Sequence, residues 1–268
     1  MGESAEVAVI GSSPFMLHKF EEPVVSGVNG TAAIFFCGCN LGCVYCQNSA
    51  VSRKGRGKEL SESELADLFV QASGSGAHTL SLITGGHFVR QTAAALKRAK
   101  PFIKVPVVWN SGGYELPASV ELLEGLVDVF LPDFKYLDRA RAARYSGAPD
   151  YGQRATECIR KMTELAPQAV ISDGIIQKGV IIRHLVMPGG RADGINIMNC
   201  IKDNFPDALV SVMRQYTPEF CPEAFPEIKR KVTSFEYDSV VEAALRAGLK
   251  GFMQQKGCEN SSYTPDFD

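Results

Sequence analysis

The sequence predicts an α/β fold, an open and partial parallel (β/α)6 barrel of the TIM-barrel type. Two observations predict it: short apolar runs rich in β-branched residues recur six times, and helical patterns lie between them. Strands that alternate with helices indicate a parallel sheet covered on both faces. Eight such units close a full barrel, so six should leave it open. The 268 residues fit one domain, with a core from about residue 15 to 257 and loosely held ends.

The elements follow in order along the chain. The six predicted strands are Ala32–Phe36, Thr79–Ile83, Val105–Trp109, Val127–Leu131, Val180–Val186 and Leu209–Met213. Ser61 and Glu64 form a capping box, which begins a helix that reaches about residues 71–73. Apolar periodicity predicts the other helices at Val89–Ala99, Ala118–Leu126, Thr156–Leu165 and Gly194–Asn204. The tail Glu259–Asp268 is expected to be a loosely held surface segment.

The composition argues against several classes of partner. Hydrophobic residues make up 45% and charged residues 22% of the chain, and the net charge of −2 gives no field that attracts nucleic acid or an anionic membrane. No apolar run approaches the roughly 18 to 20 residues of a membrane-spanning helix. The N-terminus lacks the basic and apolar regions of a signal peptide. We therefore expect a cytoplasmic protein with no nucleic-acid or membrane partner.

Three closely spaced cysteines are the strongest signal of chemistry. Cys39, Cys43 and Cys46 are separated by three and then two residues, and no further cysteine follows until Cys158. A [4Fe-4S] cluster is normally held by four cysteines, so three leave one iron open to an outside ligand. The alternative is structural zinc, which needs a closed set of four ligands, commonly from a second cysteine or histidine pair. The pattern favours the cluster, with the three cysteines as metal ligands and as the centre of catalysis.

The remaining cysteines indicate a reduced protein. Four of the eight lie between Cys37 and Cys46, and nothing in the sequence indicates export, so disulfides are not expected. We interpret Cys37 as a buried thiol outside the cluster. A cluster with an open iron degrades in oxygen, which favours an anaerobic or strongly reducing cell.

The stretch around the cysteines resembles a known signature. Gly38–Asn48, with an aromatic residue, Tyr45, before the last cysteine, resembles the motif of radical S-adenosylmethionine enzymes in the form found in pyruvate formate-lyase activating enzymes. The likeness to a branch of uncharacterised proteins related to those activating enzymes runs from about His18 to Gln255. It rests on five further motifs: Glu21–Gly27, Ile83–Phe88, Leu131–Tyr136, Arg183–Gly189 and Met213–Pro218.

The resemblance implies two cofactors and a reaction. The methionyl amino and carboxylate groups of S-adenosylmethionine would chelate the open iron of the [4Fe-4S] cluster. One electron from the cluster would then split the sulfonium and give a 5′-deoxyadenosyl radical, which abstracts hydrogen from the substrate. A ferredoxin or flavodoxin is the expected electron donor.

Polar and glycine motifs follow the predicted strands, where the functional groups of parallel α/β folds gather. Gly85 and Gly86 allow backbone to approach a charged amine. They resemble a glycine pair that contacts the methionyl amino group, although His87 stands where Glu is usual. Asn110 and Ser111 resemble a ribose-contacting position. A plain turn is the alternative at both places.

Asp133 and Lys135 follow the fourth strand, and their spacing puts both side chains on one face. Burying them there would be costly without polar partners. They are similar to the Asp-Leu-Lys of the activating enzymes, which implies that Asp133 contacts the ribose hydroxyls and Lys135 lies near the methionyl carboxylate. The alternative is a self-satisfied ion pair without a ligand.

Arg183, Gln215, Tyr216 and Tyr45 complete the predicted cofactor contacts. Arg183 suits a carboxylate or phosphate because its guanidinium donates two parallel hydrogen bonds. Gln215 and Tyr216 lie where the activating enzymes carry a histidine that contacts the ribose, and both are neutral groups able to hydrogen-bond to adenosine. We interpret the neighbouring His184 as a structural residue.

The sequence therefore predicts a radical S-adenosylmethionine enzyme. Activation of a glycyl-radical enzyme is the preferred hypothesis, because the cysteine motif is of the activating-enzyme type and the short chain leaves the barrel open laterally to a protein partner. Radical modification of a small molecule or a peptide is the alternative. A zinc-binding module without enzymatic activity is a third hypothesis, which metal analysis would reveal.

Overall fold

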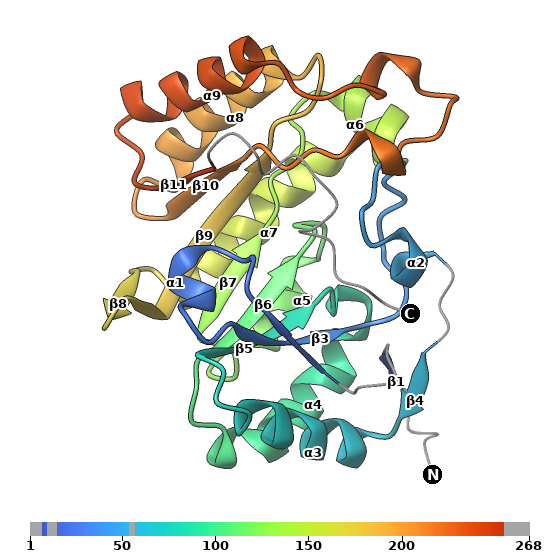
Figure 1. Cartoon of the computed structure of the whole chain (residues 1–268). Helices are drawn as coiled ribbons and strands as arrows, with labels where there is room; N and C mark the ends of the chain where they lie inside the picture. The colour runs from blue at the N-terminus through green and yellow to red at the C-terminus, as the bar shows by residue number, and fades with distance from the viewer. Residues whose placement is uncertain (1–6, 10–14, 54–56, 255–268) are drawn as a thin grey trace.

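The computed structural model describes residues 7–9, 15–53 and 57–254. Its main sheet contains the six predicted parallel strands, which lie beside one another in chain order (Figure 1). They are β3 (Thr31–Phe35), β5 (Thr79–Ile83), β6 (Val107–Ser111), β7 (Val129–Pro132), β9 (Ile175–Leu185) and β10 (Leu209–Met213). Within the described residues the two edges of the sheet are not paired with each other, so the predicted open barrel is confirmed.

Helices connect these strands. The first, α3 (Glu62–Ser73), begins at the predicted capping box, in which the Ser61 N–H donates to Glu64 Oε2 at 2.9 Å. The others between the strands are α4 (Val89–Ala99), α5 (Pro117–Glu121), α6 (Arg139–Ser146), α7 (Tyr151–Leu165) and α8 (Arg191–Asn204). The predicted helix Ala118–Leu126 is shorter than expected, because residues 122–126 form turns that bury Leu123 and Leu126 without continuing the helix.

The sequence did not predict the elements at the rim of the sheet. They include β2 (Met16–His18), antiparallel to β3, β8 (Val170–Ser172), which forms a hairpin with β9, and β11 (Gly251–Met253), a seventh parallel strand beside β10. Before the expected core, β1 (Val7–Val9) pairs with β4 (Lys58–Leu60). The remaining elements are α1 (Pro23–Ser26), α2 (Ser49–Ser52), α9 (Ser234–Arg246) and 3-10 turns at Gly86–Phe88, Lys100–Phe102, Pro218–Phe220 and Pro226–Ile228.

The two faces of the sheet bury different residues, because successive side chains of a strand point to opposite faces. Phe130 and Ile182 pack into the large core beneath the connecting helices. Val129 and Ile181 instead contact Val25 of α1, which has no exposed surface. The short helix α1 therefore fills the inside of the open barrel and lies across the sheet in Figure 1.

Two further expectations concern the C-terminal tail and membrane-spanning helices. The tail Glu259–Asp268, and residues 255–257 of the expected core, lie outside the described residues. Among the helices that the structure describes, none combines the length and the apolar character needed to cross a lipid bilayer.

Candidate active site

The three motif cysteines line one cavity at the C-terminal edge of the parallel strands. After β3, Gly38 adopts a φ of +84°, which favours glycine, and turns the chain into the loop that carries Cys39, Cys43 and Cys46. All three line a cavity of about 200 Å³. The buried Cys37 is not among the lining residues. The loop thus presents three thiols to a single space.

Hydrogen bonds hold this loop against two other parts of the fold. The Val44 N–H donates to the Tyr145 carbonyl at 2.8 Å, at the end of α6. On the other side, Gln47 Nε2 donates to the carbonyl of Gln215 at 2.9 Å, in the turn after β10. These bonds fix the loop between two elements that are far apart in sequence, which restricts where its sulfur atoms can lie.

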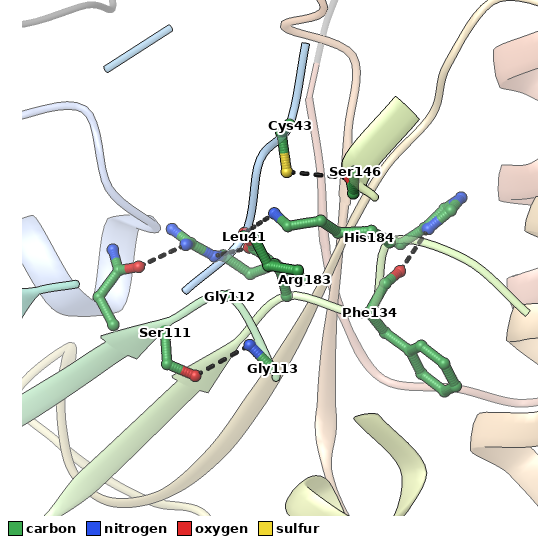
Figure 2. Close-up of polar contacts among 12 residues, drawn as sticks. Leu41, Cys43, Ser111, Gly112, Gly113, Phe134, Ser146, Arg183 and His184 are labelled. Carbon is green, nitrogen blue, oxygen red and sulfur yellow. Dashed lines mark hydrogen bonds and ion pairs between the residues drawn. The ribbon is translucent and has the colours of Figure 1, made fainter. Parts of the chain in front are cut away.

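Each cysteine sulfur lies beside a hydrogen-bonding group, and Figure 2 shows the contact between Cys43 and Ser146. The Leu41 nitrogen lies 3.4 Å from Cys39 Sγ. The Ser146 hydroxyl lies 3.0 Å from Cys43 Sγ, and the Ser52 hydroxyl lies 3.5 Å from Cys46 Sγ. Hydrogen bonds to sulfur are a regular part of the surroundings of iron-sulfur clusters.

The donor set fits a [4Fe-4S] cluster. The three cysteines are free, so their sulfurs can bind iron. Burial raises the pKa of the Cys43 thiol and raises that of Cys39 to about 11, so iron binding must displace protons from both. Among the described residues, no three His, Cys, Asp or Glu side chains lie close enough together to bind one single metal ion. A cube places its cysteine sulfurs on separate irons, and three sulfurs around one cavity suit that arrangement.

A network of charged side chains crosses the cavity beside the cysteines. Arg183 lies at its centre (Figure 2), with Nε donating to Asp133 Oδ1 at 3.0 Å and Nη1 donating to Glu21 Oε2 at 2.9 Å. Its Nη2 donates to Asn110 Oδ1 at 2.6 Å, and Asn110 Nδ2 donates to Glu21 Oε1 at 2.9 Å. Lys135 Nζ pairs with the second oxygen of Asp133. Asp133 and Glu21 therefore pair with Lys135 and Arg183 where the segment before α1 meets the ends of β6, β7 and β9.

Burial and pairing together set the charges in this network. Burial would raise the pKa of Asp133, but Arg183 and Lys135 hold it below its ordinary value. Burial would lower the pKa of Lys135, but Asp133 raises it overall. Burial raises the pKa of Glu21 despite the opposing effect of Arg183. The network thus keeps an ionised Asp133 and a protonated Lys135 close to the cysteines.

Most of the residues predicted from the sequence line this cavity. They are Cys39, Cys43, Tyr45, Cys46, Asn110, Asp133, Lys135, Arg183 and Gln215. Tyr216 lies behind Tyr45, with 5.8 Å between the ring centroids, and its hydroxyl donates to the Ile228 carbonyl at 2.8 Å. It is not among the lining residues, and neither are Gly85, Gly86 and Ser111.

The two glycines pack against buried side chains. A Cβ at Gly85 would lie 2.7 Å from the Trp109 ring, and one at Gly86 would lie 2.6 Å from Glu115 Oε1. Ser111 donates to the other oxygen of Glu115 at 3.0 Å. Only glycine fits in this loop without displacing those side chains.

The two motif histidines also lie outside the cavity lining. His184 is buried, with Nδ1 2.8 Å from the Phe134 carbonyl (Figure 2). His87 Nε2 lies 2.6 Å from the Cys37 carbonyl, which links the glycine loop to the cysteine loop. Each therefore makes a hydrogen bond to the backbone.

Sequence reasoning missed the residues that the segment from β2 to α1 brings to the cavity. His18, Phe20 and Glu21 line it, and Glu21 completes the network around Arg183. The signal that could have found Glu21 is the acidic pair before Pro23, the residue that begins α1. No predicted strand precedes this pair, so the strand-end argument did not apply to it.

Comparison with known proteins places the chain in a family. Residues 33–189, more than half of the chain, match the model of the Radical SAM superfamily. The chain belongs to this superfamily. An uncharacterized protein of Methanocaldococcus jannaschii is 33% identical over 243 residues, which cover 87% of this chain and 66% of that protein. This radical SAM chain therefore spans slightly less than two thirds of that relative.

Solved structures share the radical SAM fold at low sequence identity. SuiB of Streptococcus suis bound to the precursor peptide SuiA is 13% identical with a TM-score of 0.58, over 82% of this chain and 47% of that one. A radical SAM methyltransferase from Sphaerobacter thermophilus is 11% identical with a TM-score of 0.57, over 85% of this chain and 68% of that one. The superfamily uses a [4Fe-4S] cluster and S-adenosylmethionine, and these are the cofactors of this radical SAM enzyme.

Proposed function

We propose that this enzyme abstracts a hydrogen atom from a polypeptide segment presented at the mouth of the cavity, with activation of a glycyl-radical enzyme as the preferred case. The observation that carries the proposal is the convergence of three thiols and the Asp133–Arg183 network in one cavity. In this proposal Cys39, Cys43 and Cys46 hold three irons of the cluster and leave the fourth open.

The chain binds and orients its cofactors, which carry the difficult chemistry. When bound, the cluster and S-adenosylmethionine supply a one-electron reaction that yields a carbon radical. Lys135, a buried cation close to Cys43, suits the methionyl carboxylate. Asp133 is ionised and suits ribose hydroxyls, while Asn110 and Gln215 supply neutral hydrogen-bonding groups at two other strand ends.

The shape of the cavity supports a substrate that reaches in from outside. The cavity of about 200 Å³ is lined by the cysteines and the charged network that would hold the cofactors, so the cofactors would occupy it and a substrate would approach from the mouth. Val25 of α1 fills the inner end of the barrel. A polypeptide segment that inserts one residue through the mouth meets both constraints. The same proposal includes a ferredoxin or flavodoxin as the electron donor and an anaerobic cytoplasm as the location.

The test combines reconstituted, reduced enzyme and S-adenosylmethionine with each candidate glycyl-radical protein of the same organism. Electron paramagnetic resonance should detect a glycyl radical on one candidate, with matching release of 5′-deoxyadenosine. If no candidate gives that signal while a peptide stimulates 5′-deoxyadenosine release, the substrate is a polypeptide other than a glycyl-radical enzyme. Stimulation by a small molecule alone would contradict the proposal of a polypeptide substrate.

A further inference from the structure

Three buried hydroxyl groups form a relay that ends on Cys43. The Tyr45 hydroxyl lies 2.5 Å from that of Tyr136, which lies 3.0 Å from that of Ser146. The Ser146 hydroxyl donates to Cys43 Sγ at 3.0 Å (Figure 2). The exposed fractions of Tyr45, Tyr136 and Ser146 are 6%, 1% and 3%. We call these three residues the hydroxyl relay.

The hydroxyl relay joins three separate parts of the chain. Tyr45 lies in the cysteine loop, Tyr136 follows β7, and Ser146 is the last residue of α6. The Ser146 carbonyl accepts the Gly42 N–H at 3.3 Å, so its position is fixed by the backbone of the cysteine loop itself. The Tyr136 ring packs edge-on against Tyr151, with 5.5 Å between centroids. Packing therefore holds each hydroxyl in place.

The chemistry of the sulfur fixes the direction of the relay. A thiolate bound to iron has no proton to donate, so Ser146 must donate to Cys43 Sγ. Ser146 has one proton, so it must accept from Tyr136, and Tyr136 must accept from Tyr45 for the same reason. All three O–H groups then point toward the sulfur, and hydrogen bonds aligned in this way polarise one another.

We propose that Ser146, Tyr136 and Tyr45 are positioning residues that set the reduction potential of the cluster through Cys43. Reduction by an external one-electron donor adds one negative charge, which the cluster shares among its sulfurs. A donated hydrogen bond stabilises this added charge, and hydrogen bonds to sulfur help to set cluster potentials. Loss of the relay makes the cluster harder to reduce. The inference rests on the cluster assignment within the proposed function and is independent of the substrate.

The test is a redox titration of anaerobically reconstituted protein, followed by the electron paramagnetic resonance signal of the reduced cluster, without S-adenosylmethionine. For Ser146→Ala we expect about a tenfold fall in the reduced-to-oxidised ratio at a fixed potential, equivalent to 59 mV for a one-electron couple. Tyr136→Phe keeps the Ser146 hydroxyl but removes its partner, and should give a smaller fall of the same sign.

Tyr237→Phe is the matched control. It removes another buried tyrosine hydroxyl, one that donates to the Val212 carbonyl at 2.9 Å, and should leave the ratio unchanged. A wild-type ratio in Tyr136→Phe overturns the relay, whether Ser146→Ala shifts, does not shift or fails to assemble a cluster. Wild-type protein that takes up no iron and sulfide would instead overturn the proposed function together with this inference.

Discussion

At the scale of single residues, Asp133 is the carboxylate on which most of the site depends. Its side chain is 17% exposed and is paired with Arg183 at 3.0 Å and with Lys135. Removing one partner of a buried pair leaves an uncompensated charge, which is far more costly than losing an exposed pair. The Glu242–Arg246 pair, with side chains 60% and 80% exposed, is a surface pair of the second kind.

Asp133→Asn should lower the free energy of unfolding by about 3 kcal/mol. It should also weaken S-adenosylmethionine binding, because Arg183 and Lys135 lose the charge that holds them. Glu242→Gln should change the free energy of unfolding by less than about 1 kcal/mol. Urea unfolding measures the free energy of unfolding of both variants. Equilibrium dialysis with the reconstituted enzyme measures S-adenosylmethionine binding. Equal losses of stability in the two variants would contradict a buried network.

His184 should make stability depend on pH. Burial lowers its pKa from 6.5 to about 4. As the pH falls through 6.5 the unfolded chain binds a proton that the folded chain does not bind until about pH 4, so the folded state loses stability across this window. The loss attributable to His184 is about 3 kcal/mol.

The comparison variant is His184→Gln, which keeps a polar side chain and does not titrate. Free energies of unfolding of wild type and variant, measured by urea at several values between pH 7 and pH 4, should diverge as the pH falls, with the wild type losing more. Parallel curves would show that His184 is not held neutral in the folded protein.

At the scale of elements, the turn that leads from β6 toward α5 depends on one glycine. Gly113 has a φ of +71°, and a Cβ there would lie 2.1 Å from the Asp133 carbonyl oxygen. Gly147, after α6, has a φ of +67° and nothing within 4 Å of a Cβ. The two glycines therefore share a backbone conformation and differ in the space around them.

Gly147→Ala should cost about 1 kcal/mol, the strain of a left-handed residue. Gly113→Ala must in addition move the backbone of Asp133, so it should destabilise by several times that amount, roughly 3 kcal/mol or more, and weaken cofactor binding. Urea unfolding of both variants makes the comparison. Similar costs at the two positions would mean that the backbone of Asp133 is free to shift.

The sequence predicted the central strands because buried strands are rich in apolar residues, which form recognisable runs in the sequence. Every residue of β3 and β5 is buried, and only Thr31, Thr79 and Ser81 among them are polar, so each strand appears as a short, mainly apolar segment. The edge strand β8 has three residues, all exposed, and α1 has four, which are too few to show a period. The helix α1 is held by packing against strands far away in sequence, which local pattern does not encode. The strand β8 instead pairs with the next strand, β9, through the two-residue turn Asp173-Gly174, a local hairpin signal that the strand prediction did not use.

The site residues also divide into some that local pattern predicts and some that it does not. Asp133 and Lys135 were predicted because they follow a strand, and Arg183 because it lies near the C-terminal end of one, and parallel strands end at one edge. Glu21 was not, because its place is set by the packing of Val25 inside the barrel. The Gly85-Gly86 pair was predicted to approach a ligand with its backbone, and the structure adds a packing reason for glycine at both positions.

At the scale of the whole molecule, an open parallel sheet carries a cysteine loop at one end and α1 inside. The sheet alone would leave the inner end of the barrel unfilled, and α1 closes it. In the proposed function the cofactors and the substrate meet at the C-terminal ends of the strands, where the thiols and the charged network lie. The chemistry of the molecule therefore depends on the central claim that the three cysteines bind the cluster.

Anaerobic reconstitution with iron and sulfide, followed by reductant and S-adenosylmethionine, tests that claim most directly. Wild-type protein should bind about four irons and four sulfides per chain and release 5′-deoxyadenosine. Cys37→Ala, which changes a thiol outside the cavity lining, should do the same, while Cys43→Ala should lose both properties. Zinc without sulfide in the purified protein, or a Cys43→Ala variant that behaves like the wild type, would contradict the account.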